Sequence, residues 1–393
     1  MKLRADTLLI KLQLMLLTGI VLTQTLGQPA VSSILFTLTF VVTACLWFVK
    51  PGKVLALLIV MASCISVAVN ALVTNTIVSF SYFKKLIMFG AAVLFFASMS
   101  EYRPEKTAVD FIFRWNTALA LFLAGMYLVQ NGKMHLLNNR ITVYLTFRFT
   151  NPNLTAVFLS AICILEVLCL FASQKRGTRI LHAVLAIIMA RFVFETRARN
   201  AQLLLLLFLT ACLLMKLFPR RRWRMTGWSA ALIAVLPLLF AAAYLPCIRI
   251  PGIRALFAFV AGEGKPLDGR VKIWTFALQN FASSPVFGAY SQISGSTGQS
   301  QLHNSHLDVL ASYGAVVLVM LCLFLYRTLR SPHSGQENVL CLTGFAALLL
   351  SGIGEATLFS GGLGIYIFAG AVRMLANFDF AHRELPYENR IFQ

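Results

Sequence analysis

Two histidines and an aspartate lie together where a long polar stretch meets a long apolar one. His303 and His306 are three residues apart and Asp308 follows closely, so on a helix the two imidazoles would share a face. This spacing can suggest a metal pair, but no third and fourth ligand stand out. A neutral imidazole at a boundary between lipid and water can also accept a proton from a hydroxyl group, because imidazole titrates near neutral pH. A packed or hydrogen-bonded structural histidine is the alternative.

Three arginines, Arg191, Arg197 and Arg199, form the densest basic group at a turn between two apolar segments. A planar guanidinium donates two parallel hydrogen bonds to phosphate oxygens, which makes arginine well suited to phosphate. We therefore expect at least one of the three to contact a phosphate group. One alternative is a structural ion pair between Glu195 and Arg197. Attraction to the head groups of ordinary anionic lipids is another.

The composition determines the solvent that surrounds these residues. Of 393 residues, 59% are hydrophobic and 12% are charged, and the mean hydropathy is +0.78. A soluble protein of this size cannot hide so much apolar surface from water and would aggregate. Lipid is therefore the expected solvent, and ionisable residues within it are candidates for function because they are costly there.

The apolar segments are long enough to cross a membrane, since a helix of about 20 residues spans the hydrocarbon core. We predict about twelve transmembrane helices, at residues 7–26, 31–49, 54–73, 77–99, 108–129, 152–173, 178–194, 200–218, 227–246, 303–327, 337–358 and 360–377. The segment 77–99 is the weakest, because it contains Lys84 and Lys85. The first segment is expected to be a retained helix, since it is longer than the apolar part of a signal peptide and a second span follows almost at once.

Basic residues indicate the orientation, because membrane proteins concentrate Lys and Arg in cytoplasmic loops. With the N-terminus inside, the dense basic clusters fall almost entirely on the inner side: Lys2/Arg4, Lys50/Lys53, Arg103/Lys106, 175–179, 216–224, Arg327/Arg330 and the C-terminal tail. We therefore predict that both termini are cytoplasmic. The net charge of +20 follows from the same bias, so no nucleic-acid partner is expected.

The predicted fold class is an all-α integral membrane protein, with a single polytopic membrane domain over residues 1–393. Two exterior loops are longer than the others, at 130–151 and 247–302. The second, between spans nine and ten, is expected to be a small exterior subdomain, in which the amphipathic segment 268–281 can lie along the membrane surface. The exterior side carries excess basic residues, which suits a phosphate-bearing lipid head group: Arg140, Arg148, Arg249, Arg254, Lys265, Arg270 and Lys272, besides the three arginines above.

The eight cysteines have no metal-ligand spacing, and seven of them lie within predicted helices. We interpret them as small apolar packing residues. The sequence therefore predicts no disulfide framework and no metal site built on cysteine.

Several short motifs resemble, in their order and exterior placement, those of the O-antigen ligase and O-antigen polymerase superfamily. The stretch His303-Asn-Ser-His-Leu-Asp-Val-Leu-Ala-Ser-Tyr-Gly314 is similar to the family's His-Asn signature in the helix after its large periplasmic loop, with His306 where the family often has Tyr. The other similar pieces are Asn151-Pro-Asn153, Thr196-Arg-Ala-Arg-Asn-Ala201 with Ala198 in place of a serine, Arg270 with Trp274, Pro285 with Gly288, and Glu355. The similarity extends over roughly residues 150–360.

The resemblance implies a chemistry. In this family a donor glycan is carried on undecaprenyl diphosphate, and an acceptor sugar hydroxyl attacks its anomeric carbon with inversion, without nucleotide or metal. The resemblance therefore implies no metal site and no cofactor. By resemblance, His303 would be the base for the hydroxyl. Arg199, with Arg197 or Arg191, would neutralise the departing diphosphate. Further expected contacts to diphosphate or sugar are Arg270, Asn304 and Glu355.

The resemblance also implies partners and a location. The partners are the undecaprenyl-diphosphate-linked glycan donor, membrane lipids, and an acceptor that is another lipid-linked glycan in a polymerase and lipid A-core in a ligase. The location is the plasma (inner) membrane of a bacterium, with the active site on the exterior, periplasmic face.

A twelve-helix secondary transporter, or a flippase for lipid-linked glycans, is the alternative from another class. Transporter halves are repeats joined by a central interior loop, whereas the longest loop here is late and exterior, and no repeat is visible. A metal-dependent membrane glycosyltransferase would need paired carboxylates in an early exterior loop. The first exterior loop, residues 26–30, contains none.

Overall fold

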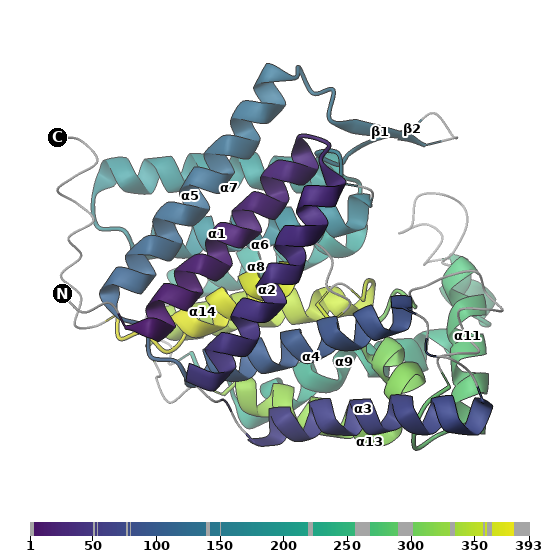
Figure 1. Ribbon diagram of the computed structural model, residues 1–393. Helices are drawn as coiled ribbons and strands as arrows, with labels where there is room; N and C mark the ends of the chain where they lie inside the picture. Colours follow the sequence, from purple (N-terminus) through teal and green to yellow (C-terminus); the bar gives the residue numbers. More distant parts are fainter. Residues whose placement is uncertain are drawn as a thin grey trace.

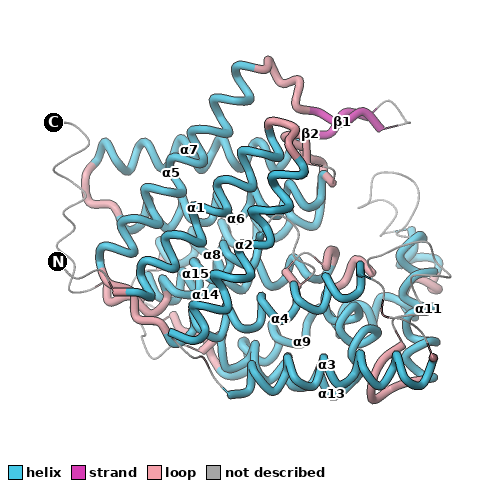
Figure 2. Tube along the Cα trace, viewed as in Figure 1, coloured by secondary structure: helices cyan, strands magenta, loops and turns pink. Residues whose placement is uncertain are grey.

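The computed structural model describes residues 4–49, 52, 54–75, 78, 80–138, 142–149, 151–218, 223–255, 268–289, 302–330, 335–356, 358–359 and 364–380. Over these ranges the chain is helical apart from one short hairpin and the connecting turns (Figures 1 and 2). The elements are α1 (Ala5–Thr25), α2 (Pro29–Val49), α3 (Val54–Thr74), α4 (Phe80–Glu101), α5 (Lys106–Val129), β1 (His135–Asn138), β2 (Thr142–Leu145), α6 (Pro152–Ala172), α7 (Arg176–Glu195), α8 (Arg199–Leu217), α9 (Gly227–Cys247), α11 (Asp268–Ser283), α13 (Ser305–Thr328), α14 (Gln336–Leu350), the 3₁₀ turn η1 (Ser351–Ile353) and α15 (Ile365–Leu375).

Eleven helices in the described ranges are long and apolar enough to cross a membrane, by length and composition. Large apolar side chains cover their outer surfaces; Phe48 and Leu72 are each 81% exposed and Trp228 is 88% exposed. Such a surface suits lipid and would aggregate in water. Helices also satisfy their own backbone hydrogen bonds, as the hydrocarbon core requires. The protein is therefore a multi-pass membrane protein, and the predicted fold class is confirmed.

Helix α6 lies at the centre of the bundle. It is the most buried span, with 83% of its apolar window inside the protein, and it packs against α5, α7, α8, α14 and α15. It begins sharply because Pro152 occupies its first turn and the side chain of Asn151 accepts a hydrogen bond from the backbone N–H of Asn153. This cap fixes Asn153 at the end of the bundle where the site is found.

The last two predicted spans differ from their expected form. Helix α14 ends at Leu350, and after η1 the backbone of residues 354–356 is non-helical and buried. Helix α15 then has 11 residues, shorter than a full span. Non-helical backbone is tolerated in a membrane protein where other protein segments cover it. The polar groups of residues 354–356 can therefore form hydrogen bonds inside the protein. Glu355 lies in this segment rather than on a helix.

Helix α15 is held at its other end by a buried arginine. The Arg373 guanidinium donates to the carbonyl oxygens of Thr328 at 2.5 Å and Arg330 at 3.2 Å, and to Asn377 Oδ1 at 2.9 Å. Only 1% of Arg373 is exposed. These bonds satisfy the donors of a cation that would otherwise be costly to bury, so α15 is fixed against the end of α13.

Helix α13 is broken at Gly314, which has φ 84° and ψ 179°. The loop that contains the Pro285–Gly288 motif fits into this break: Ala289 N–H donates to the Ala311 carbonyl at 2.8 Å, and Ala315 N–H donates to the Pro285 carbonyl at 2.9 Å. The backbones touch, since a Cβ added to Gly314 would lie 1.9 Å from the Val286 carbonyl oxygen. The Pro285–Gly288 motif and the turn at Gly314 thus form one backbone contact, which we call the Gly314 joint.

The two long loops of the sequence analysis are described only in part. Residues 256–267 and 290–301 of the expected 247–302 subdomain lie outside the described residues. Helix α11 within it packs on α9 and α13, where Trp274 is fully buried and its Nε1–H donates to the Leu302 carbonyl at 2.7 Å. The loop at 130–151 contains the antiparallel β1–β2 hairpin, which the sequence analysis did not predict. Figure 1 shows this hairpin and α11 toward the same side of the molecule.

Gly314→Ala should destabilise the protein, because it disrupts the contact between the break in α13 and the loop of Pro285–Gly288. Gly314 has a combination of φ and ψ that is essentially restricted to glycine, so alanine there costs about 1–3 kcal/mol in backbone strain alone. Its Cβ would also displace the Val286 carbonyl. We expect a large drop in the thermal unfolding midpoint of the detergent-purified protein. Gly125→Ala is the matched control, because nothing lies within 4 Å of a Cβ at that helical position. Equal unfolding midpoints for the two variants would contradict the close backbone contact at Gly314.

Candidate functional site

A buried carboxylate is the centre of the site. The Glu355 side chain is 3% exposed. Its Oε1 accepts hydrogen bonds from Asn153 Nδ2 at 2.6 Å and from Arg270 Nη2 at 3.1 Å, and its Oε2 lies 3.0 Å from His303 Nδ1. The three partners come from the first turn of α6, from α11, and from the residues just before α13. Four distant parts of the sequence therefore meet at one carboxyl group, which we call the Glu355 cluster: Asn153, Arg270, His303 and Glu355.

The backbone around Glu355 is held as firmly as its side chain. The Glu355 N–H donates to the Ser351 carbonyl at 3.1 Å, and the Ser305 hydroxyl donates to the Glu355 carbonyl at 3.2 Å. Asn200, in the first turn of α8, donates to the same Ser351 carbonyl at 2.9 Å. Gly354 makes room for it, since a Cβ there would lie 2.9 Å from the Asn200 amide. The start of α8 is thus joined to the Glu355 segment.

His303 is oriented by this carboxylate. Its side chain is 27% exposed, and its backbone has φ 52°, in the left-handed region. A carboxylate accepts a hydrogen bond from Nδ1–H, so the neutral imidazole in this pair has its free lone pair on Nε2. The ring can therefore accept a proton at Nε2, and the neighbouring negative charge stabilises the imidazolium that results.

Asn304 supports His303 rather than pointing outward. Its Oδ1 caps α13 by accepting from the backbone N–H groups of His306 and Leu307, at 3.1 and 3.0 Å. Its Nδ2 donates to the carbonyls of Pro237 and Ile353, and none of Asn304 is exposed. The amide is fully used inside the protein, so this geometry gives Asn304 a positioning role; the substrate contact expected for it stays a prediction.

His303 and His306 do not share a helix face, because the Asn304 cap makes α13 begin at Ser305 and leaves His303 outside the helix. The expectation from the helical spacing was therefore wrong. His306 is 3% exposed and its Nε2 lies 2.7 Å from the Ala234 carbonyl. Asp308 forms an ion pair with Lys85 of α4 at 2.6 Å. Across the described ranges, no group of three or more His, Cys, Asp or Glu residues could hold a metal.

The three arginines at the turn between α7 and α8 have different surroundings. Arg191 pairs with Glu195 at 3.0 Å, and that carboxylate also accepts from the Tyr127 hydroxyl at 3.0 Å. Within the described residues, Glu195 thus pairs with Arg191 and not with Arg197. The Arg197 backbone has φ 56°, and its guanidinium lies 6.0 Å from the centre of the Tyr144 ring on β2.

Arg199 differs from the other two arginines. It is the first residue of α8 and exposed, and in the part of the chain described here it has no ion pair or side-chain hydrogen bond. Its neighbour Asn200 contacts the Glu355 segment. Because α6, α8 and α13 all begin at this end of the bundle, their N-terminal partial charges add to the arginines. This end of the protein can therefore bind an anion beside an oriented imidazole.

His303, Arg270 and Glu355 were predicted from the sequence as site residues, but their pairing was not. Asn153 was not predicted as a partner, although it belongs to the Asn151-Pro-Asn153 motif. A sealed polar cluster among the spans was also not predicted; in it Glu166 accepts from Asn116 Nδ2 at 2.8 Å and lies 2.7 Å from His182 Nδ1. An acidic residue inside an apolar run was the available signal for this cluster.

A family model described as O-antigen ligase matches residues 184–322. This stretch contains the arginine turn, α11 and the His303 signature, and the match confirms the resemblance to the O-antigen ligase and polymerase superfamily. Asn153 and Glu355 lie outside the matched residues. No curated protein and no solved structure matches the chain.

Glu355→Gln should destabilise the protein, because it removes the charge that compensates Arg270 and orients His303. Breaking a largely buried pair in this way costs about 3 kcal/mol. Glu355→Gln/Arg270→Gln should recover part of this loss, because the unpaired cation is then gone. The thermal unfolding midpoints of the detergent-purified variants measure both effects. Glu195→Gln is the control for a more exposed pair and should change the midpoint little; a double variant no more stable than Glu355→Gln would refute the pairing.

Proposed function

We propose that this O-antigen ligase-type chain transfers a glycan from undecaprenyl diphosphate to a sugar hydroxyl of an acceptor, at the outer face of a bacterial plasma membrane. The family match indicates a glycan transferase of the ligase or polymerase type. The observation that carries the proposal is the pair formed by half-buried His303 and buried Glu355.

In this mechanism His303 acts as the general base. Its Nε2 accepts the proton of the acceptor hydroxyl while the hydroxyl oxygen forms a bond to the anomeric carbon of the donor. The bond from that carbon to the diphosphate oxygen breaks on the opposite side, and its electron pair leaves with the diphosphate, so the anomeric centre is inverted. Glu355 stabilises the imidazolium through Nδ1–H, as in other carboxylate-oriented histidine bases.

Arg199 is the best-supported partner for the departing diphosphate. Negative charge grows on the leaving group in the transition state, and a fixed cation near it lowers the barrier. Arg191 is already paired with Glu195, and Arg197 lies over an aromatic ring. Arg199, in contrast, is open at the N-terminus of α8. Arg270 then has a positioning role through Glu355, and contact with the donor would be an additional one.

The proposed orientation has both termini in the cytoplasm. The Glu355 cluster, the β1–β2 hairpin and α11 then face the exterior, and the opposite end of the bundle carries the basic clusters of Arg4, 175–179 and Lys216, as the positive-inside rule requires. An Arg4–Glu105 ion pair at 3.1 Å keeps the first helix at that opposite end. Acceptors compatible with this arrangement are another lipid-linked glycan or lipid A-core.

A secondary transporter or flippase is less well supported. Transporter sites lie near the middle of the membrane, whereas the Glu355 cluster lies where α6, α8 and α13 begin, at one end of the bundle. The polar cluster deeper in the bundle, formed by Asn116, Glu166 and His182, is sealed, since the side chains of Glu166 and His182 are 0% and 1% exposed. It therefore offers no path for a substrate in this conformation.

His303→Ala should lose nearly all transfer, because a positioned base typically contributes roughly 10²–10⁴-fold to such a step. His306→Gln is the matched control: it removes the other imidazole but keeps a side-chain donor for the Ala234 carbonyl. The measurement is product formation from a purified lipid-linked donor, with variants at matched levels in membranes. Normal transfer by His303→Ala, or loss confined to His306→Gln, would falsify the assignment of the base.

Arg199→Ala should also abolish transfer while the protein still folds, because the residue is exposed. Arg199→Lys should remain poor, since an ammonium cannot reproduce the bidentate guanidinium contact with phosphate. Arg249→Ala is the control, an exposed cation just after α9 at the same end of the bundle. If Arg199→Ala transfers as well as Arg249→Ala, Arg199 does not act on the diphosphate.

A further inference from the structure

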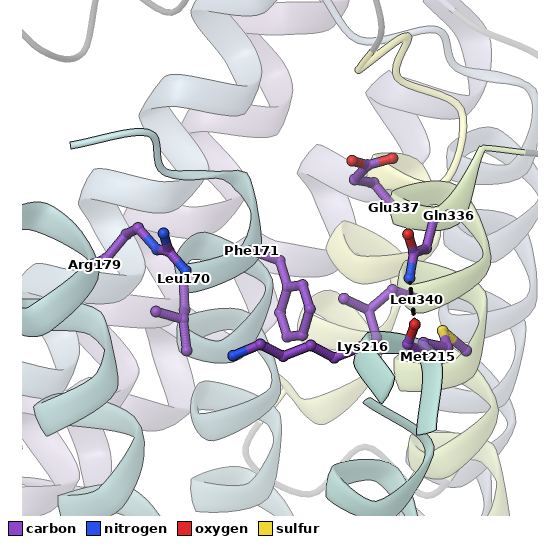
Figure 3. Close-up of a pocket in the computed structure, with 8 residues that line it drawn as sticks. All are labelled: Leu170, Phe171, Arg179, Met215, Lys216, Gln336, Glu337 and Leu340. Carbon is purple, nitrogen blue, oxygen red and sulfur yellow. Dashed lines mark hydrogen bonds between the residues drawn. The ribbon is translucent and has the colours of Figure 1, made fainter. Parts of the chain in front are cut away.

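A second site lies at the end of the bundle opposite the Glu355 cluster. A cavity of about 330 Å³ opens between α6, α7, α8 and α14, lined by Leu170, Phe171, Arg179, Met215, Lys216 and Leu340 together with the first turn of α14 (Figure 3). Helix α8 connects the two sites: it begins at Arg199 and has 19 residues, which at 1.5 Å each is a rise of roughly 28 Å. The cavity therefore lies at the other membrane surface, where lipid head groups are found.

Two cations face this cavity without a partner. Arg179 of α7 and Lys216 of α8 are both exposed, and neither has an ion pair or side-chain hydrogen bond among the residues that the structure describes. Figure 3 shows the Lys216 side chain extending past Phe171 toward the Leu170 side of the cavity, on which Arg179 also lies. Two cations from different helices on one cavity attract an anion.

The one acidic residue of the described lining does not neutralise these cations. Glu337 lies in the first turn of α14, where the helix N-terminus favours a negative charge. No ion pair within 4.0 Å joins it to Arg179 or Lys216, both of which are described residues, and in Figure 3 its carboxylate points away from Lys216. The positive charge of the cavity therefore remains available.

Apart from Gln336, the rest of the described lining is apolar. Met215 and Leu340 are 4% and 3% exposed, and Leu170 and Phe171 continue this wall along the end of α6. On one side Gln336 Nε2 donates to the Met215 carbonyl at 2.9 Å, which joins α14 to α8 (Figure 3). A small soluble anion would use the cations but leave this apolar wall in water, whereas a phospholipid covers both.

We propose that this cavity binds one anionic phospholipid, with its phosphate between Arg179 and Lys216 and its acyl chains against the wall of Leu170, Phe171 and Leu340. The lipid would join α7 and α8, which flank the arginine turn, to α6 and α14, which lead to Asn153 and Glu355. This site is independent of the transfer reaction and does not require the proposed function to be correct.

Native mass spectrometry of the full-length protein in detergent tests the proposal, with dioleoyl phosphatidylglycerol and dioleoyl phosphatidylcholine as probes. We expect one phosphatidylglycerol to bind in preference to phosphatidylcholine. Arg179→Gln/Lys216→Gln should weaken this binding roughly 30-fold, since each cation near an anionic lipid contributes about fivefold. Both side chains are exposed, so the substitutions should leave the fold intact, which a single monodisperse elution peak confirms.

Lys175→Gln/Arg176→Gln is the matched control, because it removes two charges from the start of α7, at the same membrane surface but outside the cavity lining. It should change phosphatidylglycerol binding less than threefold. Equal losses in the two double variants would mean general attraction to the basic surface and would overturn the site. So would equal binding of the two lipids, or displacement of phosphatidylglycerol by millimolar glycerol 3-phosphate, which would identify the ligand as a soluble anion.

Discussion

The arrangement of one whole end of the helix bundle depends on one buried carboxylate, Glu355. A charged Glu355 would cost several kcal/mol without partners, and its partners come from α6, from α11 and from the residue before the cap of α13. Each of these bonds compensates the charge and also fixes an element that carries a functional group. The hydrogen bonds that compensate the buried charge therefore also align the imidazole of His303, so stability and the proposed chemistry depend on the same atoms.

The joint at Gly314 has a complementary role. Helix α11 carries Arg270, and two backbone hydrogen bonds join the loop after α11 to the broken turn of α13. The backbone hydrogen bonds of that break, which hydrocarbon cannot satisfy, are satisfied by the loop. The segment of α11 and its following loop is thus attached at two points, by the hydrogen bond from Trp274 to the Leu302 carbonyl and by the backbone contact at Gly314. Arg270 therefore reaches Glu355 from a fixed helix.

Hydropathy predicted the spans well because length and apolar content are local properties of the sequence. Pairings were not predictable where they depend on tertiary packing. His303 lies outside α13 because Asn304 caps the helix one residue later, which the i, i+3 spacing could not indicate. Arg191 rather than Arg197 pairs with Glu195, because residues four apart meet on a helix and Arg197 follows the helix end. Glu355 was identified from the sequence by its motif. Its place in a non-helical segment was not predicted, because the predicted span 337–358 extended past Leu350, where α14 ends.

The ion pair between Lys85 and Asp308 has a consequence for biogenesis. The two residues are 223 positions apart, and at a synthesis rate of roughly 5–20 residues per second the first waits on the order of ten to forty seconds for the second. During this time α4 contains a lysine with no Asp308 to pair with. Lys85 lies in the second turn of α4, so its flexible side chain can reach the membrane interface and remain hydrated. Arrival of α13 then allows the cation to be buried, so the late helix completes the insertion of the early one.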